Sequence, residues 1–404
     1  MKILFLTDNF PPEVNAPANR TYEHCKEWAK NGNEVTVITC FPNFPKGKVF
    51  PGYKNKLKQV ELIDGIKVIR VWSYITANEG FVKRTLDYLS FSFSSFIFGL
   101  FVKTDIIVAT SPQFFTAVSG RWLSFFKKKP WIFEVRDLWP ESIVAVGAMK
   151  ENKVIKYLEK VEVNLYKNAS RIVVVTDSFK RKIIEKGIDE KKISVFKNGV
   201  NLESYPPILK NQDLEKELNL TGKIVFGYIG THGMAHGLDF ILRSVKTIEK
   251  SHPNFHFLFL GDGAERSNLI HLKDELNLDN VTMLPSVSKK DVLAYLSLMD
   301  YALVNLRKSD TFLNVIPSKI FEAASMQRPI LLGLEGETKQ IIDDFGAGLC
   351  FEPENQIDFI SKLNDITNNE MQESFKLGCK NLALEFDRNG IASKMLEDIK
   401  TVAF

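Results

Sequence analysis

The stretch KNGVNLESYPP (Lys197–Pro207) decides the fold, because a pattern of alternating strands and helices runs up to it and starts again after it. Asn-Gly followed by Pro-Pro is typical of a linker between domains. A chain of 404 residues is also too long for one ordinary hydrophobic core. We therefore expect two domains of similar size, residues 1–200 and 201–386, and a last helical segment, residues 387–404.

Both halves alternate short apolar runs with helical patterns such as Arg20–Lys30 and Val154–Tyr166. The predicted strands are Lys2–Leu6, Glu34–Thr39, Lys67–Val71, Ile106–Ala109, Trp131–Val135 and Arg171–Val175 before the linker, and Ile224–Ile229, Phe255–Leu260, Val281–Leu284, Tyr301–Val304 and Ile330–Leu332 after it. This alternation predicts parallel sheets with helices on both faces, that is, two doubly wound α/β domains.

Charge differs between the two halves. Residues 1–200 hold 32 Lys and Arg against 20 Asp and Glu, whereas residues 201–404 hold 21 against 29. A basic first half indicates an anionic partner, which can be nucleic acid, a phosphorylated ligand or anionic lipid. Nucleic acid is the weakest of these, because the sequence shows no helix-turn-helix spacing, zinc knuckle or RNA-binding aromatic signature.

The cysteines and the N-terminus indicate a cytoplasmic protein. The four cysteines form no CxxC pair and no metal-like spacing: Cys25, Cys40, Cys350 and Cys379. The apolar run at the start, of about four residues before Asp8, is too short for a signal peptide. Scattered thiols without an export signal favour a reducing compartment.

The segment YLSFSFSSFIFGLFV (Tyr88–Val102) raises the question of a membrane. About 15 residues carry no charge, short of the roughly 20 that a spanning helix needs. One interpretation is a buried helix that packs on the first sheet. The other is a partly exposed, Phe-rich face that dips into a bilayer interface beside basic residues. The run Lys127–Lys129 suits an anionic membrane surface, although such a run is also common on surfaces that face only water.

The stretch PWIFEVRDLWPES (Pro130–Ser142) brings a cation and an anion to the end of a buried strand. Arg136 and Asp137 follow the predicted strand directly. Ligands of parallel α/β sheets bind beyond the carboxyl ends of the strands, so the two residues form either a structural ion pair or part of the chemistry. Glu13, in the loop after the first strand, is the other carboxylate that the topology favours for a cleft between the two predicted domains. Either Glu13 or Asp137 could take a proton from a substrate hydroxyl.

Two glycine-containing turns in the second half follow predicted strands: GTHGMAHGLDF (Gly230–Phe240) and GDGAERSNL (Gly261–Leu269). Glycine lets a backbone approach a ligand closely, and a helix start offers free N–H groups to an anion. A diphosphate beside His232 and His236 would favour the protonated forms of both side chains. Asp262 reads as a turn residue rather than a metal ligand. The candidate phosphate-binding residues are Gly230, Thr231, His232, His236, Gly237, Gly261, Gly263 and Arg266.

The stretch NVIPSKIFEAAS (Asn314–Ser325) predicts a helix with Pro317 in its first turn, where a missing N–H is tolerated. Ser318 and Lys319 then join the free N–H groups in a cradle for a negative group. Glu322 lies one turn deeper on the same face. Its carboxylate could accept hydrogen bonds from a ribose diol, or it could be a surface residue. Phosphates at the helix start and a sugar on the carboxylate describe a nucleotide site.

Together these motifs resemble the GT-B fold of family 4 glycosyltransferases, over essentially the whole chain. The segments that carry the resemblance are FPPEVNAPANR (Phe10–Arg20), FKNGVN (Phe196–Asn201), GDGAER, VTMLPSVS (Val281–Ser288), PSKIFEAASMQRPIL (Pro317–Leu331) and DRNGIASKMLEDI (Asp387–Ile399). EVRDLWPES, GTHGMAHGLDF and PSKIFEAA are most similar to a bacterial polysaccharide branch, the WbuB-like N-acetyl-L-fucosamine transferases. The resemblance implies two Rossmann-like domains that face a central cleft, the first for the acceptor and the second for a nucleotide sugar. It also implies a final helix that returns to the first domain.

Three features depart from the family pattern. Asn314 stands where the family's Glu-x7-Glu motif has its first acid, and Glu322 is the second. Thr231 and His236 replace the usual Arg and Lys of the first phosphate turn. Arg136 replaces a common His. The nucleotide-binding frame is kept, while the residues around the transferred sugar differ.

The resemblance implies a sugar transferase that uses a UDP-sugar, with N-acetyl-L-fucosamine or a related deoxy-amino sugar as the group transferred. The acceptor would be a polyprenyl-diphosphate-linked glycan of O-antigen or capsule biosynthesis, at the inner face of the cytoplasmic membrane. Ser318-Lys319, Arg266 and His236 would take the charge of the leaving diphosphate in place of a metal cofactor. Arg136 would hold Asp137 ionised or bind the acceptor phosphate. The alternatives are a UDP-sugar 2-epimerase with the same frame and a non-catalytic nucleotide-sugar binder.

Overall fold

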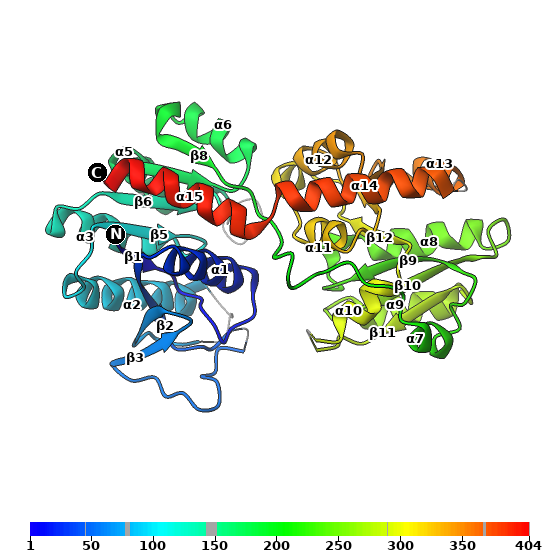
Figure 1. The fold of residues 1–404 in the computed structure, drawn as a ribbon, viewed down its shortest axis with the longest axis horizontal. Coiled ribbons are helices and arrows are strands. Elements are labelled where there is room, and N and C mark those ends of the chain that lie inside the picture. The colour runs from blue at the N-terminus through cyan, green and yellow to red at the C-terminus, as the bar shows by residue number, and fades with distance from the viewer. Residues whose placement is uncertain (45, 77–80, 143–151, 289, 367–368, 404) are drawn as a thin grey trace. The chain divides into compact units, whose positions relative to one another are not determined.

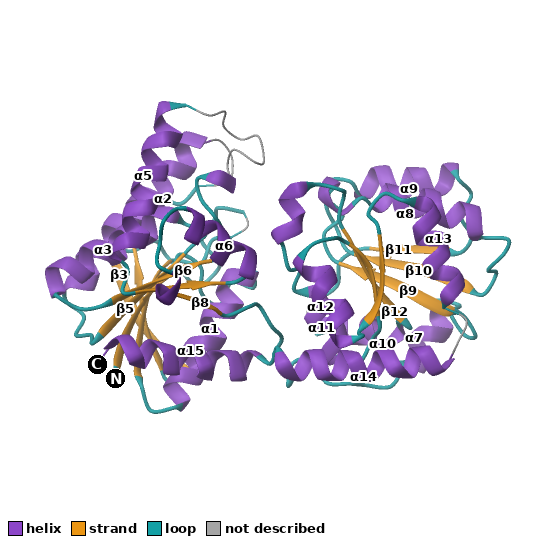
Figure 2. Ribbon diagram, turned by 90° about the horizontal axis from the view of Figure 1, so that it is seen from above, coloured by secondary structure: helices purple, strands orange, loops and turns teal. Residues whose placement is uncertain are grey.

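The chain folds into two compact units in the computed structural model, which describes residues 1–44, 46–76, 81–142, 152–288, 290–366 and 369–403. The N-terminal unit consists of Met1–Asn198 and Arg388–Phe404, and the C-terminal unit of Gly199–Asp387. Both units contain a sheet with helices on both faces (Figure 1, Figure 2).

The sheet of the N-terminal unit has eight strands in the order β3-β4-β2-β1-β5-β6-β7-β8. The strands are β1 (Lys2–Leu6), β2 (Glu34–Cys40), β3 (Lys58–Ile63), β4 (Ile66–Val71), β5 (Ile106–Thr110), β6 (Trp131–Val135), β7 (Arg171–Val174) and β8 (Ile193–Val195). β3 pairs antiparallel with β4, and the other neighbours are parallel. The strand order reverses between β1 and β5, which is where a doubly wound sheet opens a crevice for ligands.

Helices cover both faces of this sheet: α1 (Ala16–Lys30), α2 (Phe81–Leu100), α3 (Phe114–Lys127), α5 (Lys153–Asn168), α6 (Asp177–Glu185) and α15 (Arg388–Ala403). α1 and α15 share one core with the sheet, through Trp28 and Met395 among others. α2, α3 and α5 share the opposite core, through Phe91, Leu123 and Leu158. The final helix is anchored where Trp28 Nε1 donates to the carbonyl of Ala392 at 2.8 Å.

The C-terminal unit has a six-stranded, all-parallel sheet in the order β11-β10-β9-β12-β13-β14. Its strands are β9 (Ile224–Ile229), β10 (Phe255–Leu260), β11 (Val281–Leu284), β12 (Tyr301–Asn305), β13 (Ile330–Gly333) and β14 (Gly348–Phe351). Its helices are α7 (Gln212–Glu217), α8 (Leu238–Ile248), α9 (Arg266–Glu275), α10 (Val292–Leu298), α11 (Lys319–Ser325), α12 (Glu337–Phe345), α13 (Gln356–Asp365) and α14 (Asn369–Glu385), with 3-10 turns η2 (Met234–His236) and η3 (Asp310–Asn314). Here the order reverses between β9 and β12.

Two doubly wound sheets were expected from the sequence, and this prediction is confirmed. All eleven predicted strands are present, and β3, β8 and β14 were missed. β3 lies at the sheet edge with Val60 and Leu62 exposed, so it has no buried apolar run. β8 has only three residues, and β14 is largely half-buried.

The Phe-rich segment forms most of α2, and Phe91, Ser94 and Ser95 on its inner side are buried. Phe93 on another side is exposed. Within the described ranges, no helix is both long enough and apolar enough to cross a bilayer.

Candidate functional site

The glycine turns after β9 and β10 pack directly on each other in the C-terminal unit. Gly230 N donates to Leu260 O at 2.9 Å, and His232 N donates to Asp262 O at 2.8 Å. A Cβ atom on Gly261 would overlap the carbonyl of Gly230, and one on Gly263 would overlap the backbone of His232. Both glycines also have a φ of +155°. The glycines are therefore required for contact between the two turns.

Asp262 stabilises its own turn, because its Oδ1 accepts a hydrogen bond from Gly263 N at 2.8 Å. This geometry agrees with a turn residue, as the sequence indicated. Arg266 lies four residues after Asp262 and is the first residue of α9.

The side chain of His232 is fully buried between the turns. Among the residues that the structure describes, neither ring nitrogen of His232 has a hydrogen-bond partner. Burial and the nearby cations Arg266 and Lys319 lower the pKa of His232 below its ordinary value. A buried imidazole without partners is destabilising, so a polar ligand would satisfy an unmet hydrogen-bonding requirement here.

The ring of His236 lies close to that of Tyr228, with ring centroids 5.8 Å apart. Burial, together with the charge of Lys319, lowers the pKa of His236 to about 4. Both histidines are therefore neutral near pH 7. Their protonation, which the sequence led us to expect beside a diphosphate, requires a bound anion.

The loop that carries His236 is held from β12, by residues that the sequence analysis missed. Asn305, the last residue of β12, donates from Nδ2 to His236 O at 2.7 Å. Arg307 donates from its backbone N to Ala235 O at 2.9 Å and from Nε to Met234 O at 2.8 Å. The sequence could have identified Asn305 by its position, because it directly follows the apolar run of β12 at the point where the strand order reverses.

Lys319 opens α11 and lies across the end of β9. Its Nζ donates to Tyr228 Oη at 2.8 Å, and a Cβ atom on Gly230 would collide with the lysine side chain. Burial lowers the pKa of Lys319 to about 8, while the charge of Glu322 opposes this effect. The turns, His232 and Lys319 therefore form one cluster, in which Lys319 carries the positive charge, and we call it the turn cluster.

The start of α11 differs slightly from the prediction. The helix begins at Lys319 with Ser318 as its N-cap, so Pro317 precedes the cap and is outside the first turn. The reason is that Phe321 N and Glu322 N both donate to Ser318 O, at 3.0 and 3.2 Å. Asn314 lies further upstream, at the end of η3.

Glu322 lies one helical turn after Ser318, as predicted from its spacing. It is half-buried, and together with Lys319 it lines a cavity of about 30 Å³ beneath α10 and α11. Val292, Leu296 and Met299 form part of the same lining. Glu322 is therefore not a simple surface residue. Thr231, in contrast, is exposed, and its carbonyl accepts a hydrogen bond from Tyr228 Oη at 2.7 Å.

In the N-terminal unit, Arg136 and Asp137 engage different partners. The guanidinium of Arg136 donates to Pro17 O at 3.3 Å and Ala16 O at 3.4 Å. The carboxylate of Asp137 accepts from Ser142 Oγ at 2.9 Å, and burial raises its pKa. The ion pair considered from the sequence is therefore not formed.

A different ion pair lies buried at β6. Arg20 Nε lies 3.0 Å from Glu134 Oε1, and both side chains are almost fully buried. Arg20 also donates to the carbonyls of Phe196 and Lys197, at 2.9 and 3.0 Å. This pair ties α1 to β6 and to the segment that follows β8.

Glu13 is buried and already engaged by backbone groups. Its Oε1 accepts hydrogen bonds from Asn43 N and Phe44 N, both at 2.8 Å. Burial raises the pKa of Glu13, although these amides oppose the shift. The geometry gives Glu13 a part in holding the loop after β2.

Two carboxylates that the sequence analysis did not select lie near Glu13. Burial and the charges of Asp87 and Glu13 raise the pKa of Asp8 well above its ordinary value. Burial also raises the pKa of Asp87 to about 7. Asp8 follows β1, where the strand order of this sheet reverses, and that position was the signal available in the sequence.

Comparisons with known proteins agree with this architecture. Residues 18–204 match Glycosyltransferase Family 4, and residues 210–381 match Glycosyl transferases group 1. The protein described as "Putative colanic acid biosynthesis glycosyl transferase WcaI" of Escherichia coli (strain K12) is 26% identical over 369 residues, which are 88% of this chain and 89% of that protein.

Solved structures with the same fold cover nearly the whole chain. The sucrose-phosphate synthase of Thermosynechococcus elongatus has a TM-score of 0.76 at 16% identity, over 99% of this chain and 98% of that chain. Anabaena HepE in complex with UDP has a TM-score of 0.71 at 15% identity, over 99% and 100%. The chain is thus a glycosyltransferase of the GT-B fold, composed of a family 4 domain and a group 1 domain.

Proposed function

We propose that the protein transfers a sugar from a UDP-sugar to a polyprenyl-diphosphate-linked glycan. The observation that carries the proposal is the turn cluster, where two glycine turns, a buried histidine and a half-buried lysine meet at the reversal of strand order. The ring nitrogens of that histidine have no hydrogen-bond partner among the described residues. A diphosphate would supply the hydrogen-bond acceptors and the negative charge that this cluster lacks. The similar fold of HepE, which was solved with UDP, supports the choice of nucleotide.

The residues would then divide the work of the reaction. Lys319, Arg266 and His236 stabilise the charge that develops on the departing diphosphate. Gly230, Gly237, Gly261 and Gly263 allow the close approach of the backbone, and Glu322 accepts from the ribose hydroxyls. In the N-terminal unit, Asp137 accepts the proton of the acceptor hydroxyl.

The proposed acceptor rests on the charge of the N-terminal half, and the proposed pathway rests on the similarity to WcaI. The basic N-terminal half favours an anionic acceptor such as a lipid-linked diphosphate. The name of WcaI, colanic acid biosynthesis, supports a role in bacterial polysaccharide assembly. We propose N-acetyl-L-fucosamine or a related deoxy-amino sugar as the group transferred, in O-antigen or capsule synthesis. The protein would work peripherally at the inner face of the cytoplasmic membrane.

A non-catalytic nucleotide-sugar binder is the second candidate, and the amide Asn314 in place of an acid favours it. The test is a panel of UDP-sugars with lipid-linked N-acetylglucosamine as acceptor, scored by product mass and anomeric configuration. Transfer releases UDP only when the acceptor is present. An epimerised donor without any acceptor requirement would identify a 2-epimerase instead, and binding without turnover would identify a binder.

Replacing Glu322 with Gln should weaken UDP binding about 10- to 100-fold, because the ribose hydroxyls then donate to a neutral amide oxygen instead of a charged carboxylate. Calorimetry should compare UDP with 2′,3′-dideoxy-UDP. The variant should lose little affinity for the dideoxy compound, which has no diol to donate. The exposed Glu275→Gln on α9 is the matched control and should bind like the wild type. Equal losses for both nucleotides would remove Glu322 from ribose recognition.

Affinity for a UDP-sugar should rise as the pH falls from 7 to 5. His232 and His236 have lowered pKa values without ligand, and a neighbouring diphosphate raises them, so binding takes up protons. Each proton taken up contributes up to about tenfold in affinity per pH unit. A UDP-sugar is the right probe, because the terminal phosphate of UDP itself titrates near pH 6.

The double variant His232→Gln, His236→Gln should flatten this pH dependence. His271→Gln, at an exposed position of α9, should leave it unchanged. A wild-type affinity that does not vary between pH 5 and 7 would contradict a diphosphate beside these rings.

A further inference from the structure

We propose that the outer face of α2 and α3 docks onto an anionic lipid bilayer. The surface consists of Leu86, Leu89, Phe93, Trp122, Phe125 and Phe126, and we call it the aromatic face. The proposal rests on the proposed function, since a polyprenyl-linked acceptor is held in a bilayer, and it identifies the surface that meets that bilayer.

Helix α3 carries large apolar side chains on its outer side as well as on its buried inner side. Its inner side buries small residues, among them Ala117, Ser119 and Gly120. A Cβ atom on Gly120 would lie 2.6 Å from Ala109 Cβ, so the helix packs closely against β5. A helix on a soluble protein normally turns its large apolar side chains toward the core. The large side chains of α3 instead include three that face outward.

Those three residues form a contiguous aromatic surface. Trp122, Phe125 and Phe126 are 52%, 59% and 58% exposed. Their rings contact each other, with centroids 6.2 Å apart for Trp122–Phe125 and 5.4 Å apart for Phe125–Phe126. Clustered exposed aromatic groups of this kind mark interaction sites rather than ordinary surface.

Helix α2 extends the surface beside α3. Phe96 of α2 contacts Phe126 with ring centroids 5.7 Å apart, and Ser95 Oγ lies 3.0 Å from Ser119 Oγ. Phe93 is 68% exposed, and Leu86 and Leu89 are also exposed. The aromatic face therefore spans both helices, as an apolar stripe that lies in a bilayer interface must.

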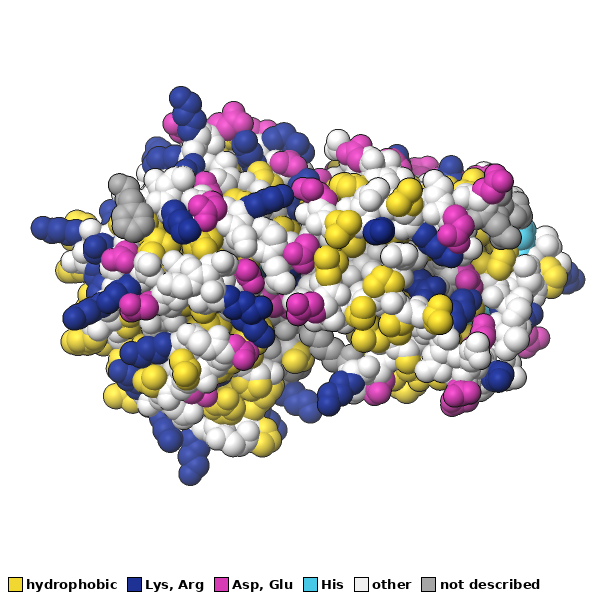
Figure 3. All heavy atoms as spheres, in the orientation of Figure 1, with side chains coloured by type: hydrophobic (Ala, Val, Ile, Leu, Met, Phe, Trp, Pro, Cys, Tyr) yellow, Lys and Arg dark blue, Asp and Glu magenta, His cyan; other side chains and the backbone are white. Residues whose placement is uncertain are grey.

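Exposed cations lie at the ends of the two helices that carry the aromatic face. Lys83 and Arg84 are exposed near the start of α2, and Lys103 and Lys128 are exposed just beyond the ends of α2 and α3. Lys127 is not part of this rim, because its Nζ donates to Leu100 O at 2.9 Å. Many Lys and Arg side chains project from the N-terminal unit in Figure 3.

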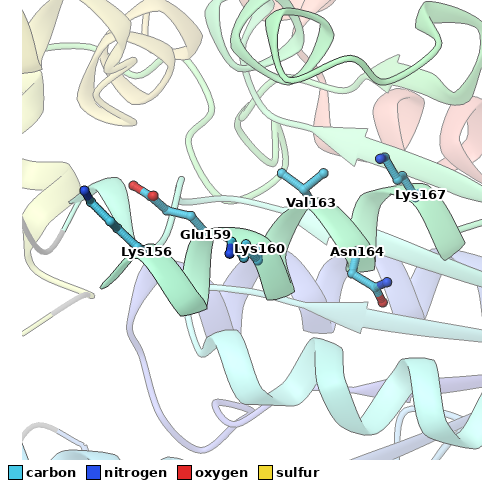
Figure 4. Close-up of a pocket in the computed structure, with 6 residues that line it drawn as sticks. All are labelled: Lys156, Glu159, Lys160, Val163, Asn164 and Lys167. Carbon is cyan, nitrogen blue, oxygen red and sulfur yellow. The ribbon is translucent and has the colours of Figure 1, made fainter. Parts of the chain in front are cut away.

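Helix α5 continues the basic rim beside α3, to which it is linked by a hydrogen bond from Arg121 Nη2 to Asn168 Oδ1 at 3.0 Å. A hollow of about 550 Å³ runs along its outer side. Its lining residues project from successive turns of α5 (Figure 4): Lys156, Glu159, Lys160, Val163, Asn164 and Lys167. Three cations and one acid give this side a positive charge, suited to anionic lipid headgroups.

Charge also decides between a bilayer and a second copy of the chain. Two copies meeting through the aromatic face would bring two basic rims together, and like charges in an interface are repulsive. An anionic bilayer offers apolar depth for the rings and negative headgroups for the rim at the same time. We therefore assign the aromatic face to a lipid surface.

The test is sedimentation with vesicles of phosphatidylcholine, with and without phosphatidylglycerol, in the absence of donor and acceptor. The wild type should bind the anionic vesicles, and high salt should weaken binding. The triple variant Trp122→Ser, Phe125→Ser, Phe126→Ser should bind at least about a hundredfold more weakly, since three apolar side chains no longer leave water. Lys103→Gln with Lys128→Gln should lower affinity about tenfold for anionic vesicles only.

The matched control removes exposed apolar side chains from the C-terminal unit, as Leu209→Ser, Ile357→Ser, Leu377→Ser, and should bind like the wild type. Wild-type protein that ignores anionic vesicles, or a triple variant that binds equally well, would overturn the proposal. A wild type that is dimeric and binds no vesicles, and that the triple variant converts to a monomer, would also overturn the proposal. Calorimetry with UDP on the same samples keeps the two proposals apart, because loss of vesicle binding with intact UDP binding contradicts only the membrane surface.

Discussion

Replacing Lys319 with Met should lower kcat/KM for sugar transfer by about 10²–10³, because a preorganised cation at the leaving group is lost. The lysine lies where the turns after β9 and β10 meet, and its Nζ is already held by Tyr228 Oη. Methionine keeps the unbranched apolar stem of the side chain and lacks the ammonium group. The comparison therefore isolates the ammonium group.

The same substitution should leave the free energy of unfolding unchanged or raise it. Burial lowers the pKa of Lys319 from 10.5 to about 8, so the folded protein holds this charge at a penalty on the order of 3 kcal/mol at pH 7. Because the folded-state pKa lies below the unfolded one, stability contributed by this group rises as pH rises from about 8 toward 10.5. Lys319→Met should remove that part of the pH dependence.

Lys339→Met is the control, at an exposed lysine of the same unit that pairs with Asp343. It should change neither turnover nor melting temperature by much. An active Lys319→Met enzyme, with a loss of less than fivefold, would mean that the diphosphate is bound elsewhere. A lower melting temperature in this variant would instead assign the lysine a structural part.

Replacing Asp137 with Asn should lower kcat by about 10²–10⁴ if Asp137 takes the proton of the acceptor hydroxyl. Asp137 stands just past the carboxyl end of β6, and its carboxylate accepts from Ser142 Oγ. Burial raises its pKa, so the carboxylate is more basic than an exposed one. Wild-type activity should fall as the pH drops through this raised pKa. A loss under tenfold would remove Asp137 from the role.

Glu13 provides the contrast that separates catalysis from folding. Its Oε1 accepts two backbone N–H groups, and Glu13→Ala would leave these donors without an acceptor, at about 1–3 kcal/mol each. We expect Glu13→Ala to lower the melting temperature, and Glu13→Gln, which keeps an acceptor oxygen, to restore much of it. Asp137→Asn should show the opposite balance, with a large loss of rate and a small change in stability.

Much of the fold was predictable because the strands are continuous apolar runs that end in glycine or polar residues. That pattern located β9 and β10 at their observed bounds and placed the glycine turns at the carboxyl ends of these strands. β3 could not be found in this way, since an edge strand with exposed Val60 and Leu62 does not read as buried.

Contacts across the sheet were less predictable, because they depend on strand order and register. Tyr228 meets Lys319 from 91 positions away, and Asn305 holds the His236 loop from 69 positions away. Arg136 and Asp137 are neighbours in the chain, but they lie in a bend after β6, where Arg136 donates to backbone carbonyls and Asp137 accepts from Ser142. Sequence adjacency therefore suggested a pair that the geometry does not form.

The aromatic face was only partly visible in the sequence. Hydrophobic composition alone does not say which side of a helix faces the core, and α3 is apolar on both sides: Leu123 is buried, whereas Trp122, Phe125 and Phe126 are exposed. The Phe-rich stretch of α2 raised the question, whereas α3 supplies most of the evidence.

The most direct measurement is a crystal structure of the protein with UDP bound. We predict that the diphosphate lies in the turn cluster, within hydrogen-bonding distance of Lys319 Nζ and His232, and that the ribose hydroxyls meet the carboxylate of Glu322. UDP bound away from the ends of β9 and β10, with His232 and Lys319 unchanged, would contradict the account.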